Sequence, residues 1–174
     1  MTGLLREEEA EEITIKKESE NSKTMESGET TSHGTIQSSE TISLKKSTFQ
    51  GHACVVNTLS EVKAVLKTLK QNKKVSQATH NIVAYRLAGV NETSFIQDYA
   101  DDGEINAGGR VLHLLQIMGV KNVVVVVSRW YGGILLGPDR FRLINNVARE
   151  AVIQLGIYEP KQAAKQRPKK KKHH

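Results

Sequence analysis

Three segments of the chain place apolar residues at the spacing of one face of an α-helix. The first follows Ser60, a residue type favoured at a helix N-cap. The second ends at Gly119, and the third begins at Pro138 and ends at Gly156, in keeping with the preference for proline in the first turn and glycine after the last. The three apolar stripes are Val62, Val65, Leu66 and Leu69; Val111, Leu114, Leu115 and Met118; and Phe141, Ile144, Ala148, Ala151, Val152 and Leu155.

Four other segments have the composition of β-strands: residues 48–57, 81–87, 95–99 and 123–127. The last is a run of five valines, which is typical of a strand buried on both faces. The resulting order, β-α-β-β-α-β-α, predicts an α+β fold: a two-layer α/β sandwich with the helices on one side of the sheet.

Both ends of the chain differ from this core in composition. Residues 1–48 contain no aromatic residue and few apolar ones, so residues 1–45 are predicted to be a disordered acidic, Ser/Thr-rich arm. Residues 46–158 form the predicted domain, and residues 159–174 form a predicted disordered Lys-rich tail. The net charge of +6 divides into −4 for residues 1–50, +3 for residues 51–160 and +7 for residues 161–174.

The composition excludes several classes of protein. Cys54 is the single cysteine, so no intramolecular disulfide can form. No apolar run approaches the ~20 residues that a membrane-spanning helix needs. The acidic N-terminus lacks the basic start and the apolar centre of a signal peptide, so we expect a cytoplasmic protein.

The densest group of unusual residues is the glycine-rich segment 128–139, which follows the valine strand and leads into a helix N-terminus. Such a turn could hold an anion. Gly132 and Gly137 have the spacing of a phosphate-binding loop, but Pro138 and Asp139 replace the required Lys and Ser/Thr. The alternatives are a tight structural connection with Trp130 and Tyr131 packed at the sheet edge, or a contact with protein or RNA.

A second group, residues 98–104, resembles the start of a calcium loop but departs from the pattern at Ala100 and Gly109. Asp101, Asp102 and Glu104 could bind a cation, pair with Arg129 or simply be solvated.

Cys54 lies between apolar neighbours, where a buried inert thiol is the common outcome, although His52 and His80 are conceivable partners for a nucleophile. The scattered Cys and His residues lack zinc-ligand spacing. The sequence therefore assigns no catalytic residue, cofactor or metal ligand, and we expect no enzyme.

Basic residues suggest a binding surface. Four lysines follow the spacing of one helix face opposite the first apolar stripe, and four more end the tail. They predict a salt-sensitive surface for RNA, the ribosome or acidic proteins, against the ordinary alternative of a solvated face. These lysines are Lys63, Lys67, Lys70 and Lys74, and Lys169, Lys170, Lys171 and Lys172.

Residues 108–137 resemble the signature of the IMPACT family, which includes bacterial YigZ proteins, and the resemblance extends over about residues 45–156. The upstream segments ATHNIVAYR (78–86) and DDGE (101–104) also fit, with Ile105 where the family usually has Pro. The Trp-Tyr pair and the following GPDRF resemble the eukaryotic branch. The matching positions are Gly108, Val111-Leu112, Leu115, Val120, Val126-Val127, Arg129, Trp130-Tyr131, Gly132-Gly133 and Leu136-Gly137.

The resemblance implies a fold like the second domain of a small-subunit ribosomal protein, with a left-handed crossover. It also implies a translational regulator that competes with the starvation-sensing initiation-factor-two kinase for its ribosome-associated activator, and that binds actin and ribosomes. Residues 1–48 are too short and polar for the RWD domain that such proteins usually carry. We expect a monomer whose contact surface comprises Asp101, Asp102, Glu104, Arg129, Trp130 and Tyr131.

Overall fold

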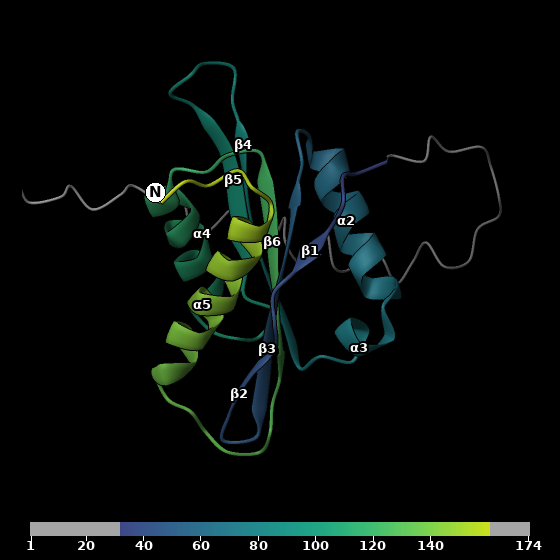
Figure 1. Cartoon of the computed structure of the whole chain (residues 1–174), viewed down its shortest axis with the longest axis vertical. Coiled ribbons are helices and arrows are strands. Elements are labelled where there is room, and N and C mark those ends of the chain that lie inside the picture. Colours follow the sequence, from purple (N-terminus) through teal and green to yellow (C-terminus); the bar gives the residue numbers. More distant parts are fainter. Residues whose placement is uncertain (1–31, 161–174) are drawn as a thin grey trace, which may run out of the picture.

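The computed structural model describes residues 32–160, which form one antiparallel sheet with helices on both faces (Figure 1). The strand order is β1-β3-β6-β4-β5, and β2 pairs with β3 beside β1. The strands are β1 (Gln37–Ser38), β2 (Ile42–Leu44), β3 (Ser47–Val55), β4 (His80–Ala88), β5 (Phe95–Ala100) and β6 (Val123–Trp130).

Helices α4 (Ala107–Met118) and α5 (Asp139–Gln154) cover one face of the sheet, and α2 (Leu59–Gln71) and α3 (Lys73–Ser76) cover the other. The α+β class is confirmed, and the seven predicted elements occur in the predicted order, with β1, β2 and α3 in addition. The predicted placement of every helix on one side of the sheet is wrong.

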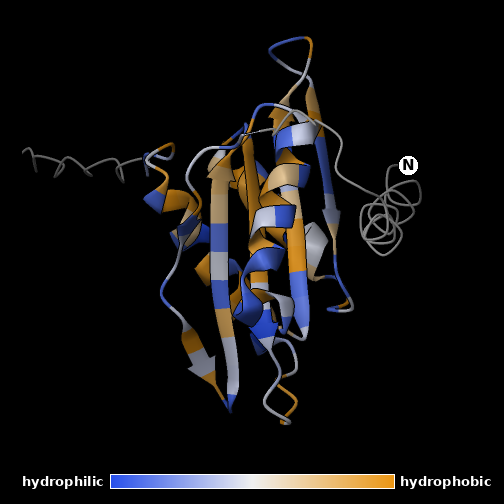
Figure 2. Ribbon diagram, turned by 90° about the vertical axis from the view of Figure 1, so that its right-hand side faces the viewer, coloured by the Kyte–Doolittle hydropathy of each residue, from blue (hydrophilic) through white to orange (hydrophobic). Residues whose placement is uncertain are grey.

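The valine run explains why both faces need a cover. Val123, Val125 and Val127 belong to the core under α4 and α5, whereas Val124 and Val126 belong to the core under α2. Successive side chains of a strand point to opposite faces, so an uninterrupted apolar run must be covered twice. Figure 2 shows this hydrophobic run at the centre of the sheet.

Strands β1 and β2 lie within the segment that was predicted to be disordered. Backbone pairing with β3 holds both strands, with Gln37 opposite Ala53 and Ile42 opposite Phe49. Ile42 and Leu44 also pack on the core under α4 and α5. The disorder predicted for residues 1–45 is therefore wrong for residues 37–44, and the predictions for residues 1–31 and 161–174 lie outside the described residues.

Helix α2 begins at a different cap from the one predicted. Thr58, with extended backbone angles, is the N-cap, and its hydroxyl accepts a hydrogen bond from the Glu61 backbone N–H at 3.2 Å. The Glu61 carboxylate accepts in return from the Thr58 N–H at 3.1 Å, which completes a capping box. Ser60 lies inside the helix and is exposed, so its predicted role as N-cap is wrong.

The other predicted helix boundaries agree with the structure. Gly119 ends α4 with φ of 68°, and Gly156 follows α5 with φ of 73°, conformations that favour glycine. Pro138 is the N-cap of α5. No helix within residues 32–160 is long and apolar enough to cross a membrane.

The capping box predicts a contrast between two neighbouring substitutions. Thr58→Ala should lower the free energy of unfolding by about 1 kcal/mol, because the Glu61 backbone N–H loses the hydroxyl oxygen that accepts its hydrogen bond. Ser60→Ala should leave it within about 0.5 kcal/mol. Urea denaturation measures both, and an equal loss in the two variants would show that Thr58 is not the effective cap.

Candidate functional site

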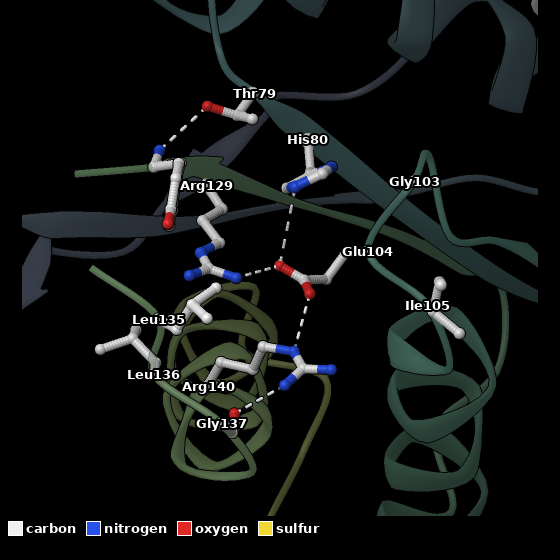
Figure 3. A pocket seen from close by; sticks show the side chains of 11 residues that line it. Thr79, His80, Gly103, Glu104, Ile105, Arg129, Leu135, Leu136, Gly137 and Arg140 are labelled. Carbon is white, nitrogen blue, oxygen red and sulfur yellow. Dashed lines mark hydrogen bonds and ion pairs between the residues drawn. The ribbon is translucent and has the colours of Figure 1, made fainter. Parts of the chain in front are cut away.

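A groove with a cavity of about 380 Å³ opens where three separate segments of the chain meet (Figure 3). They are the start of β4, the turn that follows β5, and the glycine-rich segment that leads from β6 into α5. Pairing of β4 with β6 places His80 opposite Arg129 and thereby joins the two predicted groups of residues. The lining residues are Thr79, His80, Gly103, Glu104, Ile105, Arg129, Tyr131, Leu135, Leu136, Gly137 and Arg140.

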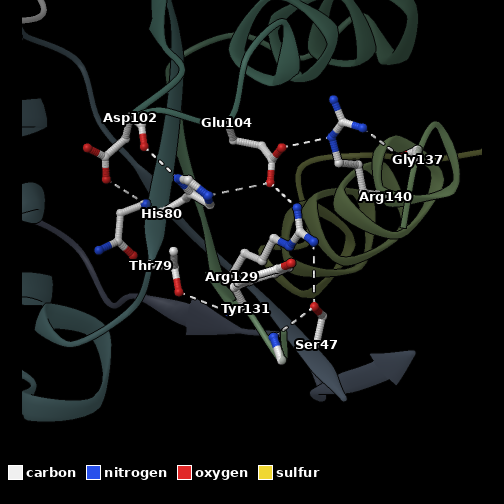
Figure 4. Close-up of polar contacts among 11 residues, drawn as sticks. Ser47, Thr79, His80, Asp102, Glu104, Arg129, Tyr131, Gly137 and Arg140 are labelled. Carbon is white, nitrogen blue, oxygen red and sulfur yellow. Dashed lines mark hydrogen bonds and ion pairs between the residues drawn. The ribbon is translucent and has the colours of Figure 1, made fainter. Parts of the chain in front are cut away.

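A buried carboxylate, that of Glu104, is shared by three basic side chains at the base of the groove (Figure 4). Arg129 donates a short hydrogen bond to one of its oxygens, and Arg140 Nε donates to the other at 2.8 Å. His80 Nε2 lies 3.9 Å from Glu104 Oε2. Of the alternatives for Glu104, the structure shows the pairing with Arg129.

Arg129 occupies a buried position between strands and rings. Its guanidinium lies 5.3 Å from the ring centroid of Phe49 and 5.5 Å from that of Tyr131. Nη2 contacts the Ser47 hydroxyl at 3.5 Å, and Nε has no hydrogen-bond partner among the described residues. Arg129 and Glu104 are each 5% exposed. Their burial corrects the prediction that both form an exposed contact surface.

Asp101 and Asp102 hold the turn beside the groove through backbone groups. The Asp101 carboxylate accepts from the N–H groups of Gly108 at 2.7 Å and Asn106 at 3.1 Å, at the start of α4. The Asp102 carboxylate accepts a hydrogen bond from the Asn81 N–H at 2.7 Å, and the Asp102 backbone carbonyl accepts one from His80 Nδ1 at 2.8 Å. These bonds give both aspartates a positioning role, and residues 32–160 contain no cluster of three potential metal-binding side chains.

The aromatic pair separates onto different surfaces. Trp130 is half-buried, and its Nε1–H donates to the Lys74 carbonyl at 3.1 Å, beside α3 and away from the groove lining. Tyr131 lines the groove with 43% of its surface exposed, and its backbone N–H donates to Thr79 Oγ1 at 2.9 Å. Tyr131 is therefore the member of the predicted contact set best placed to meet a partner.

Sequence reasoning missed several residues of the groove. Leu135 is 83% exposed and Ile105 is 68% exposed, and with Tyr131 they give the groove an apolar rim. Arg140 lines it from the first turn of α5. The available signal was the presence of bulky apolar residues in turns that otherwise carry glycine, aspartate and glutamate.

Among residues 32–160, the candidate nucleophile Cys54 has no histidine partner. The Cys54 thiol is buried, which raises its pKa, and it donates to the Gly34 carbonyl at 3.3 Å. His52 hydrogen bonds with Ser38 at 2.8 Å and Ser128 at 3.2 Å, and burial lowers its pKa to about 4. Neither His52 nor His80 hydrogen bonds with Cys54 in the part of the chain that the structure describes, which favours the interpretation of an inert thiol.

The lysines of the predicted basic face lie on two helices, because α2 ends at Gln71 and Lys74 belongs to α3. Lys63, Lys67, Lys70, Lys73 and Lys74, here called the lysine face, are all exposed on α2 and α3. They form no ion pair with any residue between 32 and 160. The acidic residue of α2, Glu61, is engaged in the capping box. Lys169–Lys172 lie outside the described residues.

Comparison with known proteins identifies the class to which this fold and groove belong. The family described as the Impact N-terminal domain matches residues 45–152. The chain therefore belongs to the IMPACT family.

Its relatives are longer proteins. The chain is 54% identical to rat Protein IMPACT over 128 residues, which cover 73% of this chain and 40% of the relative. It is 57% identical to Protein IMPACT-B of Xenopus tropicalis over 121 residues, 70% of this chain and 38% of that protein. The chain thus spans about two fifths of the length of the curated relatives that it matches.

Two solved structures resemble the fold. One is of Yih1, described as a two-domain translational regulator, with 38% identity and a TM-score of 0.51 over 77% of this chain and 53% of Yih1. The other is described only as a hypothetical protein, with 28% identity and a TM-score of 0.60 over 70% of this chain and 59% of the other.

The shared carboxylate predicts a large effect of one conservative substitution. Glu104→Gln should lower the free energy of unfolding by about 3 kcal/mol, because it leaves the buried Arg129 cation without its counter-charge. Glu92→Gln, at an exposed site in the turn between β4 and β5, should change it by less than about 0.5 kcal/mol. Chemical denaturation measures the free energy of unfolding of both variants. A small effect of Glu104→Gln would contradict the prediction and would mean that water solvates the Arg129 cation in place of the carboxylate.

Proposed function

We propose that this chain is a non-enzymatic translational regulator of the IMPACT type. In this proposal it binds the ribosome-associated activator of the starvation-sensing kinase that phosphorylates initiation factor two, and so limits activation of that kinase. The observation that carries the proposal is the family match over residues 45–152, supported by the likeness to Yih1, which is described as a translational regulator. Actin and ribosomes are further proposed partners, and the cytoplasm is the proposed compartment.

The groove is the surface that we assign to the protein partner. Tyr131, Leu135 and Ile105 expose apolar side chains around a base that holds Arg129, Arg140 and the single carboxylate of Glu104. Aromatic and arginine side chains beside a pocket are the residue types that dominate binding energy at protein interfaces. An apolar rim around a base with excess positive charge suits a partner segment that carries both apolar and acidic side chains.

The state of the ionisable groups favours binding over catalysis. Both oxygens of the Glu104 carboxylate are engaged by arginines, one by Arg129 and the other by Arg140. The alternative of an enzyme with an anion site at the glycine-rich turn would need a group that activates substrate. The histidine that lines the groove, His80, already uses its Nδ1 in a hydrogen bond with the Asp102 backbone carbonyl, which favours a structural role for this side chain.

A charge placed on the rim should separate binding from folding. Leu135→Asp should weaken binding of the purified kinase activator at least about tenfold, because it replaces an apolar contact on the rim with a charge. Leu135 is largely exposed, so the substitution should leave the folded core intact. Val90→Asp, fully exposed in the turn between β4 and β5, is the matched control and should bind like the parent chain. Affinity is measured by surface plasmon resonance, and thermal unfolding checks that both variants fold. Full binding by Leu135→Asp would remove the rim from the proposal.

The lysine face favours a second candidate, direct binding of RNA or the ribosome. Five exposed cations on adjacent helices, without ion-pair partners among residues 32–160, form a surface that can neutralise phosphates. This function uses the face of the sheet that carries α2 and α3, so it can coexist with a protein partner in the groove.

Salt dependence measures how many of these lysines contact RNA. Replacing Lys63, Lys67, Lys70 and Lys74 with Gln should reduce the slope of log K against log salt by up to about 3, since each contact with single-stranded RNA contributes about 0.7. Lys121→Gln with Arg142→Gln, which removes exposed charge elsewhere, is the control and should change the slope less. Fluorescence anisotropy with a labelled RNA gives the slopes. Equal slopes in the parent chain and the lysine variant would exclude this face as the RNA surface.

A further inference from the structure

The described chain begins directly beside the lysine face. His33 Nε2 hydrogen bonds with Thr68 Oγ1 of α2 at 2.7 Å, and Ile36 packs against the core under α2. Figure 1 shows the segment that precedes β1 crossing α2 on its way into the sheet. Thr68 is the neighbour of Lys67 in the sequence. The residues that precede Ser32 are therefore tethered next to five exposed lysines.

The tethered segment carries the opposite charge. Residues 1–31 contain nine glutamates and four basic residues, a net charge of −5. Five of the glutamates fall within six positions, at Glu7, Glu8, Glu9, Glu11 and Glu12. On the other side, the lysine face has no ion-pair partner among the described residues. A cluster of negative charge and a cluster of positive charge are thus joined by one stretch of chain.

The length of that stretch is sufficient for the two clusters to meet. Ser32 lies twenty positions after Glu12. A chain of twenty residues without regular structure has a root-mean-square span of about 25 Å. Helix α2, with 13 residues, is about 20 Å long. A tether of this length gives an effective concentration in the millimolar range, at which weak ion pairs between clusters become populated.

We infer that the acidic segment 7–12 docks on the lysine face of the same chain. The docked segment covers the charges that would otherwise meet an external polyanion, so it competes with RNA for this face. The contact consists of exposed ion pairs and is weakened by salt, since the screening length falls to a few ångströms near 1 M.

The basic tail is the competing site for the acidic segment, and its attachment point argues against it. Leu155 and Tyr158, which precede the tail, pack against the core under α4 and α5. The acidic segment is attached on the opposite face of the sheet, beside α2. The point at which residues 1–31 join the fold therefore lies beside the lysine face, on the opposite side of the sheet from the base of the tail.

A spin label in the full chain tests the docking without any RNA or protein partner, so its outcome is independent of both proposed functions. Ala10→Cys places a nitroxide within the acidic segment, and the label reacts selectively because Cys54 is fully buried. At about 20 mM salt, amide relaxation enhancement at residues 63–74 should be at least about threefold larger than in a labelled variant with Glu7, Glu8, Glu9, Glu11 and Glu12 replaced by Gln. At about 0.5 M salt the two proteins should give equal values.

Two lysine variants identify the surface that holds the segment. Replacing Lys63, Lys67, Lys70 and Lys74 with Gln should abolish the salt-sensitive enhancement on α2, whereas replacing Lys169, Lys170, Lys171 and Lys172 with Gln should preserve it. The inference is overturned if the enhancement does not depend on salt or on the five glutamates. It is also overturned if the tail variant loses the enhancement while the lysine-face variant keeps it.

Discussion

The Glu104 carboxylate is the interaction on which the arrangement of the groove depends. It lies at the end of a turn and receives hydrogen bonds from β6 through Arg129 and from α5 through Arg140. A buried charge is tolerated only when it is paired. Displacing β6 or α5 from the turn would therefore take an arginine away from the buried Glu104 carboxylate. Asp101 and Asp102 fix the same turn through backbone bonds to the start of α4 and to β4. These contacts join β4, β6, α4 and α5 to the turn after β5 at the base of the groove.

Strand β6 determines which residues reach the groove. Arg129 continues the set of Val123, Val125 and Val127 toward α4 and α5, whereas Trp130 points toward α3. The alternation of side chains along a strand therefore places two adjacent members of the family signature on opposite faces of the sheet. Arg129, Trp130 and Tyr131 were grouped as one predicted contact surface because arginine and aromatic residues dominate binding energy at interfaces. The strand continues to Trp130, and this extension separates them.

Periodicity predicted the elements that bury a face of their own. The helical stripes and the valine run were sufficient for α2, α4, α5 and β6, because each carries an apolar pattern that local sequence displays. Strands β1 and β2 are two and three residues long and are held by pairing with β3, so their own sequences carry too little pattern. The Thr58 cap was missed because Thr58 and Ser60 are both favoured cap residues, and the choice depends on where Glu61 closes the box. For the candidate site, residues of both predicted segments line the groove, but the burial of Arg129 and Glu104 depends on tertiary packing that the local sequence does not display.

The two faces of the sheet differ in chemistry, and this difference relates the charge of the chain to its fold. On the side of α4 and α5, opposite charges are paired inside the groove, and exposed apolar side chains form its rim. On the side of α2, five cations stand together without a counter-charge among residues 32–160. The net charge of +6 describes neither surface, since it adds an acidic segment and a basic tail to the core. The described chain begins beside α2, where His33 bonds Thr68, so the acidic segment is joined to the fold next to the lysine face. The proposed docking would make the availability of that face depend on the whole chain and not on the folded core alone.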